Sequence, residues 1–137
     1  MRCYECNSEE FERRSVELAT RVGEHTVIDR SVRRPVCASC GAYTIPSKVL
    51  EGVELRAAIV AFKDAPKVTG GMLRFARKAL SMTQLQLAER LGATAESVSR
   101  WERGEREMEQ WISPAVIGLL CERVMPPLND TELRKAS

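Results

Sequence analysis

Hydrophobic and polar side chains alternate along two stretches near the N-terminus. Valine, leucine or threonine occupies every second position from residue 16 to residue 22, and an alternating pattern returns over residues 27–34. Gly23 and Glu24 interrupt the pattern between the two stretches. Because successive side chains of a β-strand point to opposite faces, this pattern predicts a β-hairpin with its tip at Gly23 and Glu24.

The spacing of apolar residues changes after Pro46. Large apolar residues then recur at helical spacing from position 49 to position 62, which is typical of an α-helix. Asp64 and Pro66 end the pattern, because proline lacks the backbone N–H that a continuing helix needs. The sequence therefore predicts a helix here, followed by a boundary between two parts of the chain near residues 66–71.

The next segment predicts three short helices in succession. Residues 72–80 have an amphipathic pattern, and Thr83 and Gln86 follow with the spacing of a capping box, in which each side chain bonds the other's backbone N–H. Gly92 supplies the left-handed turn that ends the second helix, and Thr94 is a good N-cap for the third. Two helices joined by a four-residue turn form a helix-turn-helix arrangement.

A last helix is predicted from Pro114 to about residue 124, because apolar residues recur there at helical spacing and proline suits a first helical turn. Its ordinary role is to pack in a core. Apolar groups on more than one side also make it our predicted interface of a homodimer, with Leu120 facing the second chain and with Val116 and Leu119 beside it. Such a dimer would read a palindromic DNA operator.

Two cysteine pairs of identical spacing bracket the predicted hairpin. Cys3 and Cys6 form the first pair, Cys37 and Cys40 form the second, and Gly41 follows as the turn of a metal knuckle requires. Four thiolates suit Zn²⁺, which binds sulfur tetrahedrally. The alternatives are disulfides, which need an oxidising compartment although no apolar leader precedes the cysteines, and a redox pair, which would be single. The sequence predicts one structural zinc per chain and a cytoplasmic protein.

The composition favours a binding protein over an enzyme. The chain has one histidine, and four thiolates would leave a metal no open position for chemistry. We find no Ser-His-Asp set, no glycine-rich phosphate loop and no run near the roughly 18 apolar residues of a membrane span. The formal net charge of +2 would become about zero with four thiolates and one Zn²⁺ (2 − 4 + 2), so total charge does not indicate nucleic acid.

These patterns predict an α+β fold in two parts. Residues 1–67 form a small domain, a zinc-clamped β-hairpin plus a helix, and residues 68–137 form an all-α helix-turn-helix domain for DNA binding and dimerisation. The first part contains few apolar residues, so we expect the metal to supply much of its stability.

The helix after Thr94 has two opposite faces. At about 100° per residue, Val98 and Trp101 share a face that packs, while Glu96, Arg100 and Arg103 share the opposite face. Arginine can bond O6 and N7 of guanine together in the major groove, so Arg100 is the principal base-reading candidate. The alternative is an ordinary solvated face on which Glu96 and Arg100 pair with each other.

Other residues complete the predicted DNA surface. Ser97 and Ser99 flank the face that carries Arg100, and Gln84, at the start of the second helix, is placed to contact the DNA backbone. Arg103 adds a positive charge. The carboxylate of Glu96 would repel phosphate unless it accepts a hydrogen bond from cytosine N4.

The second half of the chain resembles the XRE (Cro/C1-type) helix-turn-helix. The resemblance rests on Thr83-Gln84-x-x-Leu87-Ala88-x-x-Leu91-Gly92 and on Val98-Ser99-Arg100-Trp101-Glu102-Arg103-Gly104. With the paired cysteines in front, nearly the whole chain resembles the MqsA/YgiT family of antitoxins. The resemblance implies a zinc domain that binds a toxin, usually an mRNA-cleaving ribonuclease, and a helix-turn-helix domain that dimerises and represses its own operon.

Two functional hypotheses remain. The first is the antitoxin of a type II toxin–antitoxin system, and the alternative is a zinc-stabilised helix-turn-helix transcriptional regulator with no toxin partner. Both share every DNA-binding feature, so the sequence does not separate them. The chain departs from the family between Gly104 and Pro114, where a longer and more acidic segment replaces a short loop. This departure bears on the partner surface or on the dimer geometry.

Overall fold

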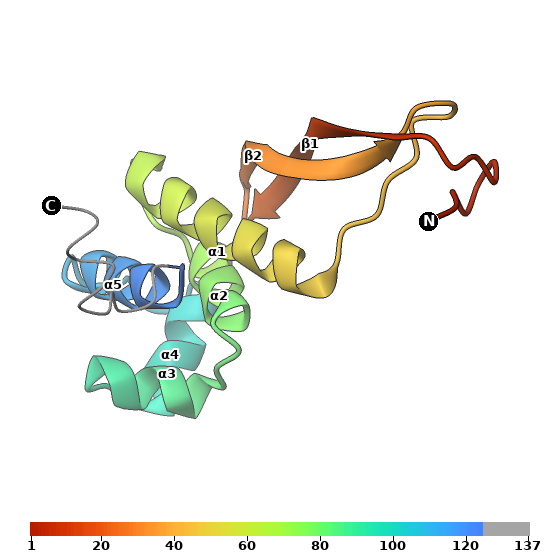
Figure 1. Cartoon of the computed structure of the whole chain (residues 1–137). Coiled ribbons are helices and arrows are strands. Elements are labelled where there is room, and N and C mark those ends of the chain that lie inside the picture. The colour runs from red at the N-terminus through yellow and green to blue at the C-terminus, as the bar shows by residue number, and fades with distance from the viewer. Residues whose placement is uncertain (125–137) are drawn as a thin grey trace, which may run out of the picture.

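The structure, a computed structural model, describes residues 1–124 of the 137 residues. A two-stranded sheet precedes five helices (Figure 1), which confirms the predicted α+β fold. The elements are β1 (Phe11–Val22), β2 (His25–Cys37), α1 (Ser47–Asp64), α2 (Gly70–Ala79), α3 (Gln84–Leu91), α4 (Ala95–Glu102) and α5 (Ile112–Val124). The last residues of the predicted second domain, from 125 onward, lie outside the described residues.

The two strands form an antiparallel hairpin whose tip lies at Gly23 and Glu24. Gly23 has a φ of +61°, a left-handed conformation that glycine adopts without steric cost. Phe11 pairs with Cys37 at the opposite, open end, so both cysteine pairs lie there. In Figure 1 the hairpin extends away from the helices, with the N-terminal knuckle at its far end.

The hairpin tip docks against the start of α2. Val22 is fully buried, and a Cβ at Gly23 would lie 2.9 Å from the backbone nitrogen of Met72. The hydroxyl of Thr69, the N-cap of α2, donates a hydrogen bond of 2.9 Å to Glu24. The hairpin, with the two cysteine pairs at its open end, forms an arm. The tip of this arm is the end that contacts α2.

Helix α1 joins the arm to the helical body. Arg56 donates two hydrogen bonds, of 3.1 and 3.0 Å, to the Asp29 carboxylate on β2. Burial raises the pKa of Asp29, but hydrogen bonds from Ser31 and Arg56 outweigh it and lower the pKa below its usual value. Val53 packs in a small apolar cluster with the hairpin, which also contains Val16, Val32 and Val36. The arm thus has a core of its own, but a very small one.

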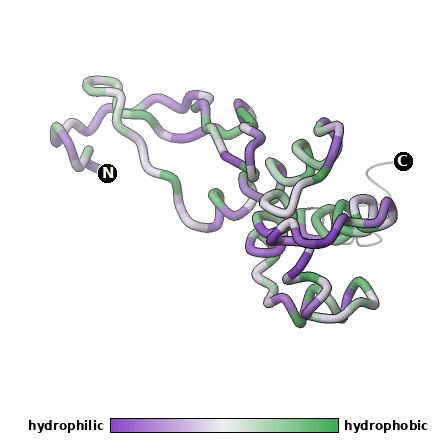
Figure 2. Tube along the Cα trace, turned by 180° about the vertical axis from the view of Figure 1, so that it is seen from behind, coloured by the Kyte–Doolittle hydropathy of each residue, from purple (hydrophilic) through white to green (hydrophobic). Residues whose placement is uncertain are grey.

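A second, larger core cluster lies among the helices. It contains residues from both sides of position 67, including Val27, Leu55, Leu73 and Leu120. Figure 2 shows hydrophobic residues along α5 and hydrophilic ones along much of the hairpin. No helix among residues 1–124 has the length and apolar character needed to cross a bilayer.

Glycine is required where α2 begins. A Cβ at Gly70 would lie 2.4 Å from the carbonyl oxygen of Trp101 and 2.5 Å from that of Glu102. The start of α2 therefore lies directly against the end of α4, closer than any side chain permits.

Candidate metal centre and nucleic-acid interface

The four predicted metal ligands come together at the open end of the hairpin. The sulfur atoms of Cys3, Cys6, Cys37 and Cys40 all lie within 4.8 Å of one another. The Sγ–Sγ distance is 3.5 Å from Cys3 to Cys40 and 3.5 Å from Cys6 to Cys37. Tetrahedral coordination with metal–sulfur bonds of about 2.3 Å places sulfur atoms about 3.8 Å apart. The cluster therefore has the size and donor set to bind one metal ion.

The two knuckles have the same backbone construction. The N–H of Asn7 donates to the carbonyl of Cys3 at 2.9 Å, and the N–H of Gly41 donates to the carbonyl of Cys37 at 2.9 Å. Each knuckle ends in a residue with left-handed backbone conformation, with a φ of 64° at Asn7 and of 78° at Gly41. Asparagine is among the few non-glycine residues that tolerate this conformation. The sequence predicts the turn at Gly41, but no local pattern marks Asn7 as the residue that ends the first knuckle.

Backbone hydrogen bonds tie the knuckles to the strands. The N–H of Cys37 donates to Ala42 at 2.9 Å, and the N–H of Ala38 donates to Glu10 at 2.9 Å. Cys3 and Cys37 are buried, whereas Cys6 and Cys40 are exposed. The first cysteine of each pair is therefore buried, and the second cysteine of each pair is exposed to solvent.

The backbone also sets the ionisation of the thiols. A hydrogen bond from the N–H of Cys40 lowers the pKa of Cys37 to about 6. The N–H of Ala42 lowers the pKa of Cys40, but the neighbouring Cys3 sulfur, partial loss of hydration within the cluster and the other two thiols together raise it to about 12. Four adjacent thiolates repel one another, and a bound cation removes this repulsion.

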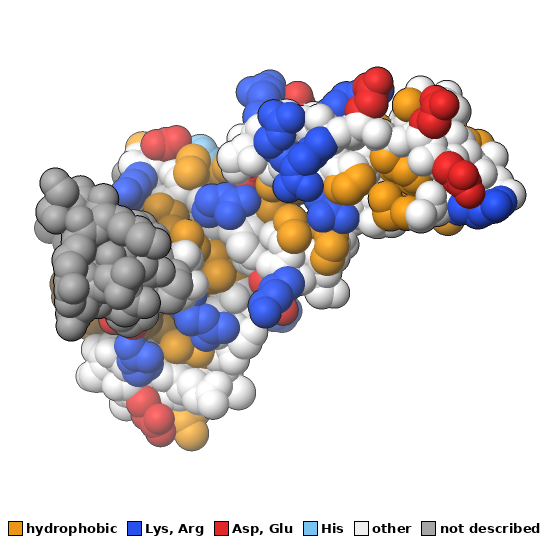
Figure 3. Space-filling view, viewed as in Figure 1, with side chains coloured by type: hydrophobic (Ala, Val, Ile, Leu, Met, Phe, Trp, Pro, Cys, Tyr) orange, Lys and Arg blue, Asp and Glu red, His pale blue; other side chains and the backbone are white. Residues whose placement is uncertain are grey.

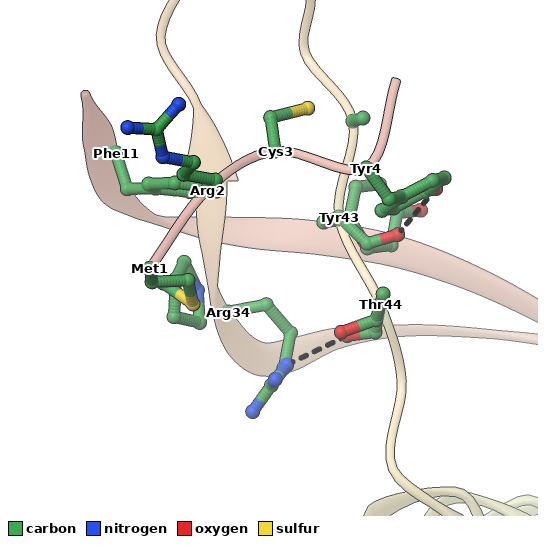
Figure 4. Close-up of a pocket in the computed structure, with 10 residues that line it drawn as sticks. Met1, Arg2, Cys3, Tyr4, Phe11, Arg34, Tyr43 and Thr44 are labelled. Atoms are coloured by element: carbon green, nitrogen blue, oxygen red, sulfur yellow. Dashed lines mark hydrogen bonds between the residues drawn. The ribbon is translucent and has the colours of Figure 1, made fainter. Parts of the chain in front are cut away.

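A small cavity of about 90 Å³ lies beside the knuckles (Figure 4). Tyr4 donates to the carbonyl of Tyr43 at 3.4 Å, and Arg34 donates to the carbonyl of Thr44 at 2.8 Å. Tyr4 remains 66% exposed. The metal end of the arm therefore presents an aromatic surface to solvent.

The hairpin also has a basic surface. Figure 3 shows basic side chains, drawn in blue, gathered over it, and within β1 and β2 these are arginines. Arg14 and Arg34 are direct cross-strand partners, and Arg13 and Arg33 are exposed nearby. Like charges opposite each other are unfavourable, and Glu12 compensates by pairing with Arg14 at 2.8 Å. This surface suits anionic groups.

The helix-turn-helix has the caps that the sequence predicts. The N–H of Thr83 donates to the Gln86 side chain at 2.9 Å, and the N–H of Gln86 donates to the Thr83 hydroxyl at 3.1 Å. Gly92 has a φ of 69°, and the Thr94 hydroxyl accepts a hydrogen bond of 3.1 Å from the N–H of Ser97. These contacts satisfy backbone groups at the starts of α3 and α4 and allow the chain to turn between the two helices.

Helix α4 has the two faces predicted. Val98 and Trp101 are buried, and Glu96, Arg100 and Arg103 are exposed. Arg100 pairs with Glu96 at 2.6 Å, with side chains 50% and 71% exposed. Such exposed pairs contribute little free energy, so the pair can open for a ligand.

The other predicted DNA-binding residues are partly buried or form hydrogen bonds within the protein. Ser97 and Ser99 are half-buried, and Arg103 donates to the carbonyl of Ser99 at 3.3 Å. Gln84 is half-buried and donates to Glu102 at 3.3 Å. Their roles toward DNA stay predictions.

A largely buried ion pair joins α2 to α4, on the side of α4 that packs within the protein. Arg77 on α2 donates to both carboxylate oxygens of Glu102 on α4, at 2.6 and 3.0 Å, with side chains 13% and 3% exposed. Arg77 also donates to the carbonyl of Met82 at 3.0 Å. The helix-turn-helix motif contains Glu102, but the sequence does not indicate its partner, because Arg77 lies 25 residues earlier in the chain.

The three residues predicted at a dimer interface lie within the core of one chain. Val116 and Leu120 have no exposed surface, and Leu119 is 9% exposed. Their apolar surface is already covered by their own helices. A second chain would therefore have to contact other surface of α5.

Fold and site together place a helix-turn-helix beside a hairpin that carries a four-cysteine cluster. A family model described as helix-turn-helix matches residues 73–122, from α2 to α5. This match supports a DNA-binding regulator of XRE type for the helical part. The cysteine cluster lies outside the matched residues. No curated protein matches the chain.

Proposed function

We propose that this protein is a sequence-specific repressor that also serves as the antitoxin of a type II toxin–antitoxin system. The observation that carries the repressor role is the exposed face of α4, with Arg100 at its middle, within a segment that matches the helix-turn-helix family. Arg100 would bond guanine in the major groove, and Glu96 would release it or accept from a neighbouring cytosine.

The metal in this proposal is Zn²⁺, bound by Cys3, Cys6, Cys37 and Cys40. The observation in its favour is the all-sulfur donor set in a cluster of tetrahedral size. A bound zinc would cross-link the two knuckles. With four protein ligands it has no open position, so its role is structural. Reduced thiolates of this kind also fit our proposal of a cytoplasmic protein.

The toxin partner is proposed to bind the metal end of the arm. Support comes from the family resemblance and from the exposed Met1 and Tyr4 beside the cavity. This end lies far from α3 and α4 in Figure 1, so one chain could hold a toxin and DNA together. Ribonuclease toxins remain the proposed class.

A homodimer on a palindromic operator completes the proposal. Two half-sites about 34 Å apart would receive the two α4 helices. Because Leu120 is buried, we now assign the contact to the outer side of α5, where Pro114 and Gly118 are exposed.

Arg100→Ala tests the repressor role. We expect a loss of about 1–3 kcal/mol on DNA from upstream of the protein's own gene and a much smaller loss on random DNA, because only a base contact discriminates. Fluorescence anisotropy with both DNAs gives the two affinities. Arg100→Lys is the matched control, since it keeps the charge but lacks the planar fork and should lose specificity alone. Equal losses on both DNAs would show that Arg100 contacts phosphate only.

Co-expression tests the antitoxin role. The protein and the product of the neighbouring reading frame should purify as a complex, and Tyr4→Ala should weaken that complex without changing operator affinity. Operator binding with no complex would favour the alternative, a zinc-stabilised regulator without a toxin.

A further inference from the structure

The segment that joins α4 to α5, residues 103–111, turns back along α4. Gly104 has a φ of +73°, which reverses the chain. Its N–H donates to the carbonyl of Trp101 at 3.1 Å, and the N–H of Glu105 donates to the carbonyl of Arg100 at 2.9 Å. The next side chain, Arg106, therefore lies beside α4 rather than beyond its end.

The guanidinium of Arg106 is held in place by α4. Its central carbon lies 5.8 Å from the centre of the Trp101 ring, within the range of a cation–π contact. One of its nitrogens donates to the Ser97 hydroxyl at 3.1 Å. The side chain nevertheless remains 48% exposed. A guanidinium that is oriented but half open loses little entropy when it binds a ligand.

Ser97 places this guanidinium at the edge of the DNA surface. Ser97 directly follows Glu96, lies one turn before Trp101, and is a neighbour of Arg100 on α4. Its oxygen accepts hydrogen bonds from Arg106 and, at 3.0 Å, from the Thr94 hydroxyl. With both lone pairs used, the hydroxyl proton of Ser97 is left to donate outward. Arg106 and Ser97 thus offer adjacent donors to one anionic group.

The charge pairing also favours Arg106 as an anion contact. Arg100 has a carboxylate at 2.6 Å and Arg103 has one at 3.3 Å, whereas among residues 1–124 the carboxylate that pairs with Arg106, that of Glu109, lies at 3.7 Å. Glu109 in turn accepts a hydrogen bond from the Trp111 ring nitrogen. Among these three arginines of the DNA surface, Arg106 has the weakest competing anion.

We propose that Arg106, together with the hydroxyl of Ser97, binds a DNA phosphate at the edge of the major groove entered by α4. The segment after Gly104, which is longer than in the family that this chain resembles, then supplies a DNA contact of its own. The proposal rests on the proposed DNA binding by α4. A phosphate contact carries no sequence information, so its role is to position α4 on the duplex.

The salt dependence of binding tests the proposal. For each chain, Arg106→Ala should reduce the slope of log affinity against log salt by about 0.9, the value for one phosphate contact on B-DNA. It should weaken operator and random DNA by the same factor. Arg106→Lys should keep the slope of the unmodified protein. Arg106→Gln should reduce the slope as much as Arg106→Ala does, although glutamine can still donate a hydrogen bond to Ser97. Arg90→Ala is the control, because Arg90 has the same charge and is 49% exposed but pairs with Glu122 on α5.

Three outcomes decide the matter. Reduced slopes for Arg106→Ala and Arg106→Gln, with no change for Arg90→Ala, support the phosphate contact. An unchanged slope in variants with native melting temperatures overturns it and leaves Arg106 a packing role on Trp101. A loss on operator alone also overturns it, in favour of a base contact. Failure of α4 to bind DNA at all would be visible separately, as absent operator binding by the unmodified protein.

Discussion

Glu102→Gln is expected to lower the free energy of unfolding by about 3–5 kcal/mol, because it leaves the buried charge of Arg77 without its partner. Glutamine has almost the shape of glutamate, so the loss reflects charge and hydrogen bonding rather than packing. The pair joins α2 to α4 with both side chains largely buried. Urea denaturation at neutral pH, followed by circular dichroism, measures the change.

Two further variants test whether the destabilisation comes from the unpaired buried charge of Arg77 or from the loss of any ion pair on α4. Glu96→Gln breaks the exposed pair with Arg100 on the same helix, and it should cost less than about 1 kcal/mol. The double change Arg77→Met with Glu102→Leu removes both charges and should recover much of the loss. A cost for Glu102→Gln no larger than that for Glu96→Gln would contradict the buried pair.

Removal of the metal should loosen the hairpin from its open end inward while the helices persist. Structural zinc contributes about 10–16 kcal/mol of apparent binding free energy in zinc-finger peptides. The small core cluster between the hairpin and α1 has four buried valines, with a few partly buried apolar residues packed against them. Val22 and Val27, at the tip, belong instead to the large helical core. Hydrogen exchange after chelation should therefore show lost protection near Phe11 and Cys37 and retained protection near Val22.

Cysteine variants provide the matched comparison. Cys37→Ser should reproduce the effect of chelation and reduce metal content, whereas Cys121→Ser, on α5 and outside the four-sulfur cluster, should leave metal content at one ion per chain. Collapse of the helical signal on chelation would show that the metal supports the whole chain rather than the arm.

The secondary structure could be predicted because local chemistry determines it. The alternation around Gly23 predicted the hairpin, and the caps at Thr83 and Thr94 predicted the starts of α3 and α4, as the structure confirms. Two helix starts differ: α2 begins at Gly70 rather than Met72, and α5 begins at Ile112 rather than Pro114. In α2 the N-cap is Thr69, which lies before the first apolar residue of the amphipathic pattern.

The contacts between distant segments could not be predicted in the same way. Nothing local indicates that Gly23 lies against Met72, that Gly70 lies against Trp101, or that Arg77 pairs with Glu102. Each of these contacts depends on how whole elements pack. The same limit applies to the predicted dimer contact of Leu120. Helical spacing shows that Leu120 lies on an apolar face, but it does not show whether that face packs against the same chain or against a second one.

Methylation interference is the measurement that tests the central claim, major-groove reading by α4, most directly. DNA fragments from upstream of the gene would be methylated sparsely at guanine N7 and adenine N3, then separated into bound and free fractions. We expect guanine N7 methylation at symmetric positions to block binding, and we expect Arg100→Ala to become insensitive to one guanine in each half-site. Interference from adenine N3 alone, in the minor groove, would contradict the account.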